Sequence, residues 1–147
     1  MSIGSIIIEH CAFNARSGMT CAMSRNIHHP TREQIDLPMV LDCLSDPTRL
    51  SIVYTLAMCE GAAPELCCGD FNALSGKSNL AYHFGKLRES GVMQTRMVGT
   101  NRWMKLRRED LDARFPGLLD AVIKSAGRDA ERLQLSDVAT TDRRRLA

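Results

Sequence analysis

Residues 75–91 read S-G-K-S-N-L-A-Y-H-F-G-K-L-R-E-S-G. A serine suited to capping opens this stretch and a glycine closes it, so we expect a helix over about residues 77–90. The apolar positions have helical spacing and form its buried side: Leu80, Phe84 and Leu87. The others face outward: Lys77, Ser78, Asn79, Ala81, Tyr82, His83, Lys86 and Arg88. Such side chains suit a DNA major groove, although polar helix faces are also common on proteins that bind no nucleic acid.

The flanking segments complete a recognisable unit. We expect a short helix over Glu65 to about Asn72 and a turn at Leu74–Gly76, and helix, glycine-containing turn, helix is the helix-turn-helix pattern. After the second helix, two short runs, Val92–Met97 and Arg102–Leu106, flank a turn at Val98–Asn101 and predict a β-hairpin. The predicted fold class is therefore mainly α with a small β-hairpin (α+β), a dimeric winged helix-turn-helix.

Further helices surround this unit. Apolar spacing predicts a helix over Leu37–Leu44 and a longer one from Pro47 to Gly61, with Ser45-Asp46 as the cap between them. A last helix covers Leu111–Ile123, and Pro116-Gly117 splits it.

Length and composition bound the organisation. The chain has 147 residues, of which 44% are hydrophobic and 24% charged, as in soluble globular proteins. We expect a flexible N-terminal arm at 1–32, a DNA-binding and dimerisation domain at 33–126 and a polar tail at 127–147. No apolar run approaches the roughly 18 residues of a membrane span, and no export signal is evident. We therefore expect a cytoplasmic protein without a membrane partner.

Charge is unevenly distributed along the chain. The net charge is only +2, but residues 75–108 hold eight basic residues and one acidic residue, a net +7. Acidic stretches flank this block, with −5 over residues 31–74 and −4 over residues 109–142. A basic block of this kind is typical of a nucleic-acid contact surface, and a solvated basic face without a partner is the alternative.

We therefore expect double-stranded DNA as the partner. The candidate DNA-binding side chains lie on the helix and on the hairpin: Lys77, Ser78, Asn79, Tyr82, His83, Lys86, Arg96, Asn101 and Arg102. The helix would enter the major groove, and the hairpin would follow the minor groove or a phosphate strand.

Three quoted stretches carry a family resemblance. They are L-S-D-P-T-R-L at 44–50, E-L-C-C-G-D-F at 65–71 and S-N-L-A-Y-H-F-G-K-L-R-E-S-G-V at 78–92. In this order and spacing, they make the chain resemble the ArsR/SmtB family of small bacterial winged-helix repressors. The resemblance implies a homodimer that binds a palindromic operator and represses transcription until an inducer binds. It also implies dimerisation through the first and last helices, here about 37–44 and 111–123.

The resemblance is weaker at the inducer site. Arsenic sensors of the family carry E-L-C-x-C-D-L, and here Cys67 matches the first cysteine whereas Gly69 stands at the second. Cys67 and Cys68 leave three interpretations open: packing, thiol oxidation or reaction with an electrophile, and binding of arsenite or a soft metal ion. The last would need Cys11, Cys21 or a cysteine of a partner chain. The family's other metal site uses histidines on the last helix, and this sequence has none there.

Two other classes of function have weaker support. A cysteine enzyme needs a base and an orienting group beside its thiolate, and neither accompanies Cys67 and Cys68. No glycine-rich phosphate loop or paired-acid motif is present either, so we expect no enzymatic activity and no cofactor beyond a metal at the cysteines. The alternative to a repressor is a winged-helix protein-interaction module without an inducer site or DNA contact.

Overall fold

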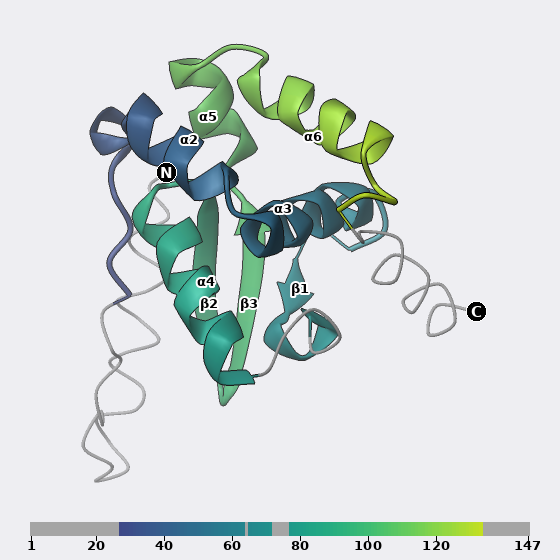
Figure 1. Ribbon diagram of the computed structural model, residues 1–147. Coiled ribbons are helices and arrows are strands. Elements are labelled where there is room, and N and C mark those ends of the chain that lie inside the picture. The colour runs from purple at the N-terminus through teal and green to yellow at the C-terminus, as the bar shows by residue number, and fades with distance from the viewer. Residues whose placement is uncertain (1–26, 64, 72–76, 134–147) are drawn as a thin grey trace, which may run out of the picture.

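The computed structural model describes residues 27–63, 65–71 and 77–133. This part of the chain forms five α-helices, two 3-10 helices and one three-stranded antiparallel sheet (Figure 1). The turn of the hairpin lies at the opposite end of the molecule from the two C-terminal helices (Figure 1). The winged helix-turn-helix fold predicted from the sequence is confirmed.

The first two helices follow their predicted bounds closely. Helix α2 spans Leu37–Leu44 and helix α3 spans Pro47–Cys59. Asp46 is the N-cap of α3, because its carboxylate accepts a 2.9 Å hydrogen bond from the backbone N–H of Arg49. The helix ends two residues before Gly61, which does not adopt a positive φ.

The helix predicted over Glu65–Asn72 is wrong. The described residues form a two-residue strand, β1 (Leu66–Cys67), and a 3-10 helix, η3 (Cys68–Phe71). Strand β1 pairs with β3, and this distant partner holds the backbone extended. Gly69 also weakens any α-helix here, because glycine has a low helix propensity.

The neighbouring contacts support this geometry. The carboxylate of Asp70 accepts a 2.8 Å hydrogen bond from the backbone N–H of Cys67, which tightens the turn after β1. Phe71 is fully buried and meets Phe84 edge to face, with ring centroids 5.5 Å apart. The predicted turn at Leu74–Gly76 lies outside the described residues.

Helix α4 spans Lys77–Glu89 and ends as its sequence predicts. Gly91 has φ +79°, and its N–H bonds to the carbonyl of Arg88 at 3.0 Å. The N–H of Val92 bonds to the carbonyl of Leu87 at 3.1 Å, and both side chains are buried. These two bonds are the Schellman motif, which turns the chain directly into the next strand.

The predicted β-hairpin is confirmed. Strands β2 (Met93–Val98) and β3 (Asn101–Leu106) pair antiparallel around a Gly99-Thr100 turn, where Gly99 has φ +60°. The sheet order is β1-β3-β2, which leaves β2 at an edge. The inward side chains are buried: Met93, Thr95, Met104 and Leu106.

The last helix is split as predicted. Helices α5 (Arg108–Arg114) and α6 (Leu118–Arg128) meet at Gly117, which has φ +76°. Helix α6 packs on α3, and Leu119 and Ile123 join the core between them. None of the helices in the described ranges is both long enough and apolar enough to cross a membrane.

The segment before α2 contacts the domain. The imidazole Nε2 of His29 accepts a 2.9 Å hydrogen bond from the backbone N–H of Thr95, at the free edge of β2. Arg107 donates to the carbonyl of Pro30 at 2.6 Å, and Ile35 is buried. Residues 27–32, which we assigned to the flexible arm, therefore pack on the sheet and α5. Residues 1–26 and 134–147 lie outside the described part.

Candidate nucleic-acid interface

Helix α4 has one buried and one exposed face. Leu80, Phe84 and Leu87 are buried, as their spacing predicts. Asn79, Tyr82 and Lys86 lie on the exposed face. The start of α4 and the β2–β3 turn lie at the same end of the molecule, as a helix and wing that contact one ligand require (Figure 1). The side chains of Lys77 and Ser78 lie outside the described part.

Tyr82 and Lys86 form a small exposed cluster. Tyr82 is 56% exposed, and the ammonium of Lys86 lies 5.9 Å from the centre of its ring. Lys86 also lies 3.5 Å from the carboxylate of Glu89, and both side chains are about half exposed. An exposed pair of this kind exchanges easily for another anion, so Lys86 remains available to a phosphate.

The prediction that His83 faces outward is wrong. The residue is 6% exposed, because position 83 follows Leu80 by three residues and precedes Leu87 by four, on the inward face. Its Nδ1 lies 3.7 Å from a carboxylate oxygen of Asp46 and makes no hydrogen bond within the described structure. His83 thus faces the start of α3 from the buried side of α4.

The hairpin has a polar tip with two exposed apolar residues. Asn101 is exposed and Arg102 is partly exposed. Met97 and Val98 are each 48% exposed beside them. The tip therefore offers an amide, a guanidinium and a small apolar surface.

Arg96 occupies a different position from the one its sequence suggests. Its Nε lies 2.8 Å and 3.0 Å from the two carboxylate oxygens of Glu65, and its Nη2 contacts the same carboxylate. The guanidinium lowers the pKa of the Glu65 carboxyl. Arg96 is thus bound to the segment that leads into β1, three residues from the hairpin turn.

Carboxylates outside residues 75–108 neutralise part of the basic block. Arg107 is largely buried and lies 2.8 Å from Asp110. Arg108 lies 2.8 Å from Glu60 and also contacts Asp120. With Arg96 bound to Glu65 as well, three of the eight basic side chains already face an acid from outside residues 75–108, so the sequence count overstates the charge available to DNA.

The two cysteines lie beside the sheet. Cys67 and Cys68 are both partly buried, and Cys67 pairs with Trp103 of β3. Within the described ranges no group of three or more histidine, cysteine or acidic side chains is placed to hold a metal ion. Cys11 and Cys21, which a metal site would need, lie outside those ranges.

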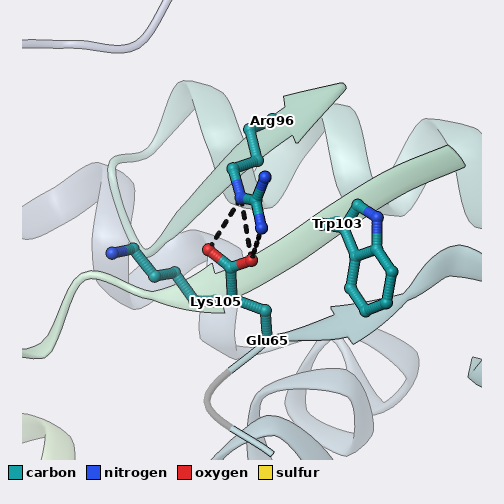
Figure 2. A pocket seen from close by; sticks show the side chains of 4 residues that line it. All are labelled: Glu65, Arg96, Trp103 and Lys105. Atoms are coloured by element: carbon teal, nitrogen blue, oxygen red, sulfur yellow. Dashed lines mark hydrogen bonds and ion pairs between the residues drawn. The ribbon is translucent and has the colours of Figure 1, made fainter. Parts of the chain in front are cut away.

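Four residues beside the cysteines lie together in a way that the sequence did not indicate. Glu65, Arg96, Trp103 and Lys105 line an open cavity of about 410 Å3 on the outer face of the sheet (Figure 2). Glu65 could not be assigned there because its segment was expected to be helical. Arg96, Trp103 and Lys105 could be expected to point outward, because exposed and buried residues alternate along the strands of the hairpin.

Comparison with known proteins identifies relatives of one kind. The chain is 32% identical over 85 residues to the "Uncharacterized HTH-type transcriptional regulator YceK" of Bacillus subtilis strain 168, covering 56% of this chain and 82% of that protein. It is 34% identical over 107 residues to the "Arsenic resistance transcriptional regulator ArsR1" of Pseudomonas putida KT2440, covering 69% and 80%. No protein-family model matches the chain.

These relatives agree with the fold and with the exposed polar face of α4 beside a wing. Both are named as transcriptional regulators, and the match covers at least four fifths of each. The chain belongs to the ArsR family of DNA-binding helix-turn-helix transcriptional regulators.

Proposed function

We propose that the protein is a transcriptional repressor that binds a palindromic operator as a homodimer. The observation that carries the proposal is the exposed face of α4, with Asn79, Tyr82 and Lys86 at the same end of the molecule as the hairpin turn. In a twofold dimer, two such helices enter successive major grooves about 34 Å apart on one side of the DNA.

The proposed contacts divide by what they recognise. The amide of Asn79 reads a base edge, since asparagine bonds adenine at two positions, and Lys77 and Lys86 reach guanine or a phosphate. The hydroxyls of Ser78 and Tyr82 hold phosphates. Asn101 and Arg102 contact the backbone beside the groove. His83 is left out of this set because it is buried, and Arg96 because its guanidinium is turned toward Glu65 on the outer face of the sheet (Figure 2).

Exposed apolar side chains on α2 support the dimer. Leu37, Met39 and Leu41 are 39%, 49% and 47% exposed on a helix of eight residues. Leu118 and Val122 are partly buried on α6. Exposed apolar side chains one helical turn apart, such as Leu37 and Leu41, are typical of a protein interface, and a twofold dimer would bury the same surface on both copies.

The cysteine pair is the proposed inducer site. Because Cys67 pairs with Trp103, a thiol modification or a bound ion at this position would act directly on the strand that begins at Asn101. The three chemistries considered are thiol oxidation, addition of an electrophile, and arsenite binding. The last is also suggested by the arsenic-resistance regulator among the relatives.

DNA binding can be tested by fluorescence anisotropy on the DNA upstream of the protein's own gene and on random DNA. We expect Asn79→Ala to weaken specific binding by about 5- to 150-fold, as for loss of one base contact, with little change on random DNA. Arg102→Gln should weaken both DNAs alike and lower the salt slope by about 1. Arg128→Gln, at the exposed end of α6, removes the same charge and should change neither. Equal losses on both DNAs for Asn79→Ala would contradict the assignment to a base.

The inducer step needs a second experiment. The reduced protein on its DNA is treated with a disulfide-forming oxidant, which takes two electrons and two protons from a pair of thiols, or with arsenite. Release by either agent, lost in the double variant Cys67→Ser/Cys68→Ser, would support the cysteine site. DNA binding that neither the oxidant nor arsenite changes would reject the cysteine site. Absence of salt-dependent DNA binding altogether would favour the protein-interaction module.

A further inference from the structure

The outer face of the sheet carries a row of chemically different side chains. Arg96 pairs with Trp103 across the hairpin, and the next row pairs Gln94 with Lys105. Because the inward neighbours of these residues are buried, their own side chains point to solvent. Figure 2 shows Glu65 reaching toward Arg96 from the neighbouring segment, with Lys105 and Trp103 on either side.

Arg96 already binds a carboxylate in this cavity. Both oxygens of Glu65 lie within 3.0 Å of Nε, and Nη2 also contacts one of them. The guanidinium is therefore turned into the cavity and is matched to a carboxylate. The Arg96 side chain is 55% exposed, and such an ion pair contributes little to stability because water and salt screen it. A carboxylate from outside can replace Glu65 at low cost.

The charges of the lining leave room for one more anion. Arg96 and Lys105 are cationic, and Glu65 is the single acid among the four lining residues. Lys105 is close enough to Glu65 to help lower the pKa of its carboxyl. If a ligand carboxylate binds Arg96, Glu65 can pair with Lys105, and the two cations then face two anions.

The fourth lining residue, Trp103, determines which chemical group would accompany the carboxylate in the ligand. Trp103 is partly exposed and borders the cavity with its indole ring (Figure 2). A flat ring gains most from an indole, because aromatic pairs bury much area in defined geometries. The cavity is open to solvent, and its volume of about 410 Å3 leaves room for a ligand of about one ring.

We propose that this cavity binds a small aromatic monocarboxylate. The carboxylate replaces Glu65 on Arg96, Glu65 turns to Lys105, and the aromatic ring lies against Trp103. Binding itself does not depend on any role in transcription. Its consequence rests on the proposed function: breaking the Glu65–Arg96 link frees the segment before Cys67 from β2 and alters how the wing meets DNA.

Trp103 is the single tryptophan of the chain, so its fluorescence reports binding directly. The probe is benzoate, titrated into the full chain at constant ionic strength, with excitation at the red edge of the tryptophan band. Benzamide keeps the ring without the charge, and acetate keeps the charge without the ring. We expect saturable quenching by benzoate and binding at least about tenfold weaker for the two controls. Equal responses to all three compounds would overturn the proposal.

Two substitutions change benzoate affinity in opposite directions. Arg96→Gln removes the cation and should abolish saturable binding. Glu65→Gln removes the competing internal carboxylate and should tighten binding by at least about threefold. Glu109→Gln, an exposed acid outside the cavity, should leave affinity unchanged. Weaker binding by Glu65→Gln, with unfolding curves like those of the parent, would mean that Glu65 builds the site and would overturn the exchange.

DNA binding separates this proposal from the preceding one. Benzoate that binds by fluorescence and also releases DNA supports both the site and its regulatory consequence. Benzoate that binds without affecting DNA supports the site and rejects the consequence. If DNA binding is intact but benzoate produces no saturable change at Trp103, the cavity is not a ligand site and the repressor proposal stands.

Discussion

Replacing Gly91 by alanine should destabilise the protein strongly. This residue joins α4 to β2 and has φ +79°, a conformation that side chains with a Cβ rarely adopt. A Cβ there would lie 2.6 Å from Cγ1 and 2.9 Å from Cδ1 of Ile35, and 3.3 Å from Cγ of Pro30. Ile35 is 1% exposed, so its side chain cannot move aside without leaving the core.

The expected magnitude follows from two separate terms. The left-handed conformation costs a residue with a Cβ about 1–2 kcal/mol. Forcing one extra carbon into a packed site costs about 1–3 kcal/mol. We therefore expect the free energy of unfolding to fall by about 2–5 kcal/mol for Gly91→Ala.

Two matched substitutions isolate these terms. Gly117 has φ +76° and no atom within 4 Å of the point that an added Cβ would occupy, so Gly117→Ala should cost only the conformational term of about 1–2 kcal/mol. Gly85 lies inside α4, has no positive φ and has equally open surroundings. Gly85→Ala should therefore stabilise the protein by about 0.5–1 kcal/mol, because alanine loses less conformational entropy.

The assay is urea unfolding followed by circular dichroism. All variants are compared at one protein concentration, because the proposed dimer would make stability depend on concentration. The order of stability should be Gly85→Ala, parent, Gly117→Ala, Gly91→Ala. If Gly91→Ala costs no more than Gly117→Ala, Ile35 and Pro30 do not pack against Gly91, and the reasoning fails.

Two further predictions concern single titratable groups. Burial, aided by Arg107 and Arg88, lowers the pKa of His29, so the stability contributed by the neutral ring is present above its usual pKa of about 6.5 and is lost as the pH falls through the folded pKa. The unfolding midpoint should therefore fall more between pH 7 and pH 5.5 in the parent than in His29→Gln, and equal falls would argue against the His29–Thr95 contact. Burial also raises the pKa of the Cys43 thiol, so in native protein iodoacetamide should modify Cys67 and Cys68 well before Cys43. Peptide mass spectrometry over time would measure this order, and equally fast labelling of Cys43 would contradict its buried position.

Local chemistry explains why most element boundaries were predictable. The cap at Asp46, the Schellman end at Gly91 and the turn at Gly99 each depend on neighbouring residues alone. Helices α2 and α4 therefore match their predicted bounds within one residue. The end of α3 was less accurate, because Gly61 resembles a helix stop but does not adopt a positive φ.

Non-local contacts explain the errors. The segment after Pro64 has a helix-like composition, yet Leu66 pairs with Met104, a residue far along the chain. Helix α3 is also buried around much of its circumference, since Ile52, Val53 and Leu56 are all buried. Helix α3 contacts α2, α4, α6 and β3, so more than one side of it is covered.

The sequence by itself determined the order of helices and hairpin, the polar face of α4 and membership of a regulator family. Periodicity, caps and turns act over a few residues and can be recognised without a partner. Only the tertiary structure decided that Arg108 binds Glu60 and that Glu65 meets Arg96 on the outer face of the sheet. These features depend on segments brought together by folding, and for charges so far apart in the chain their separation does not indicate which of them will meet.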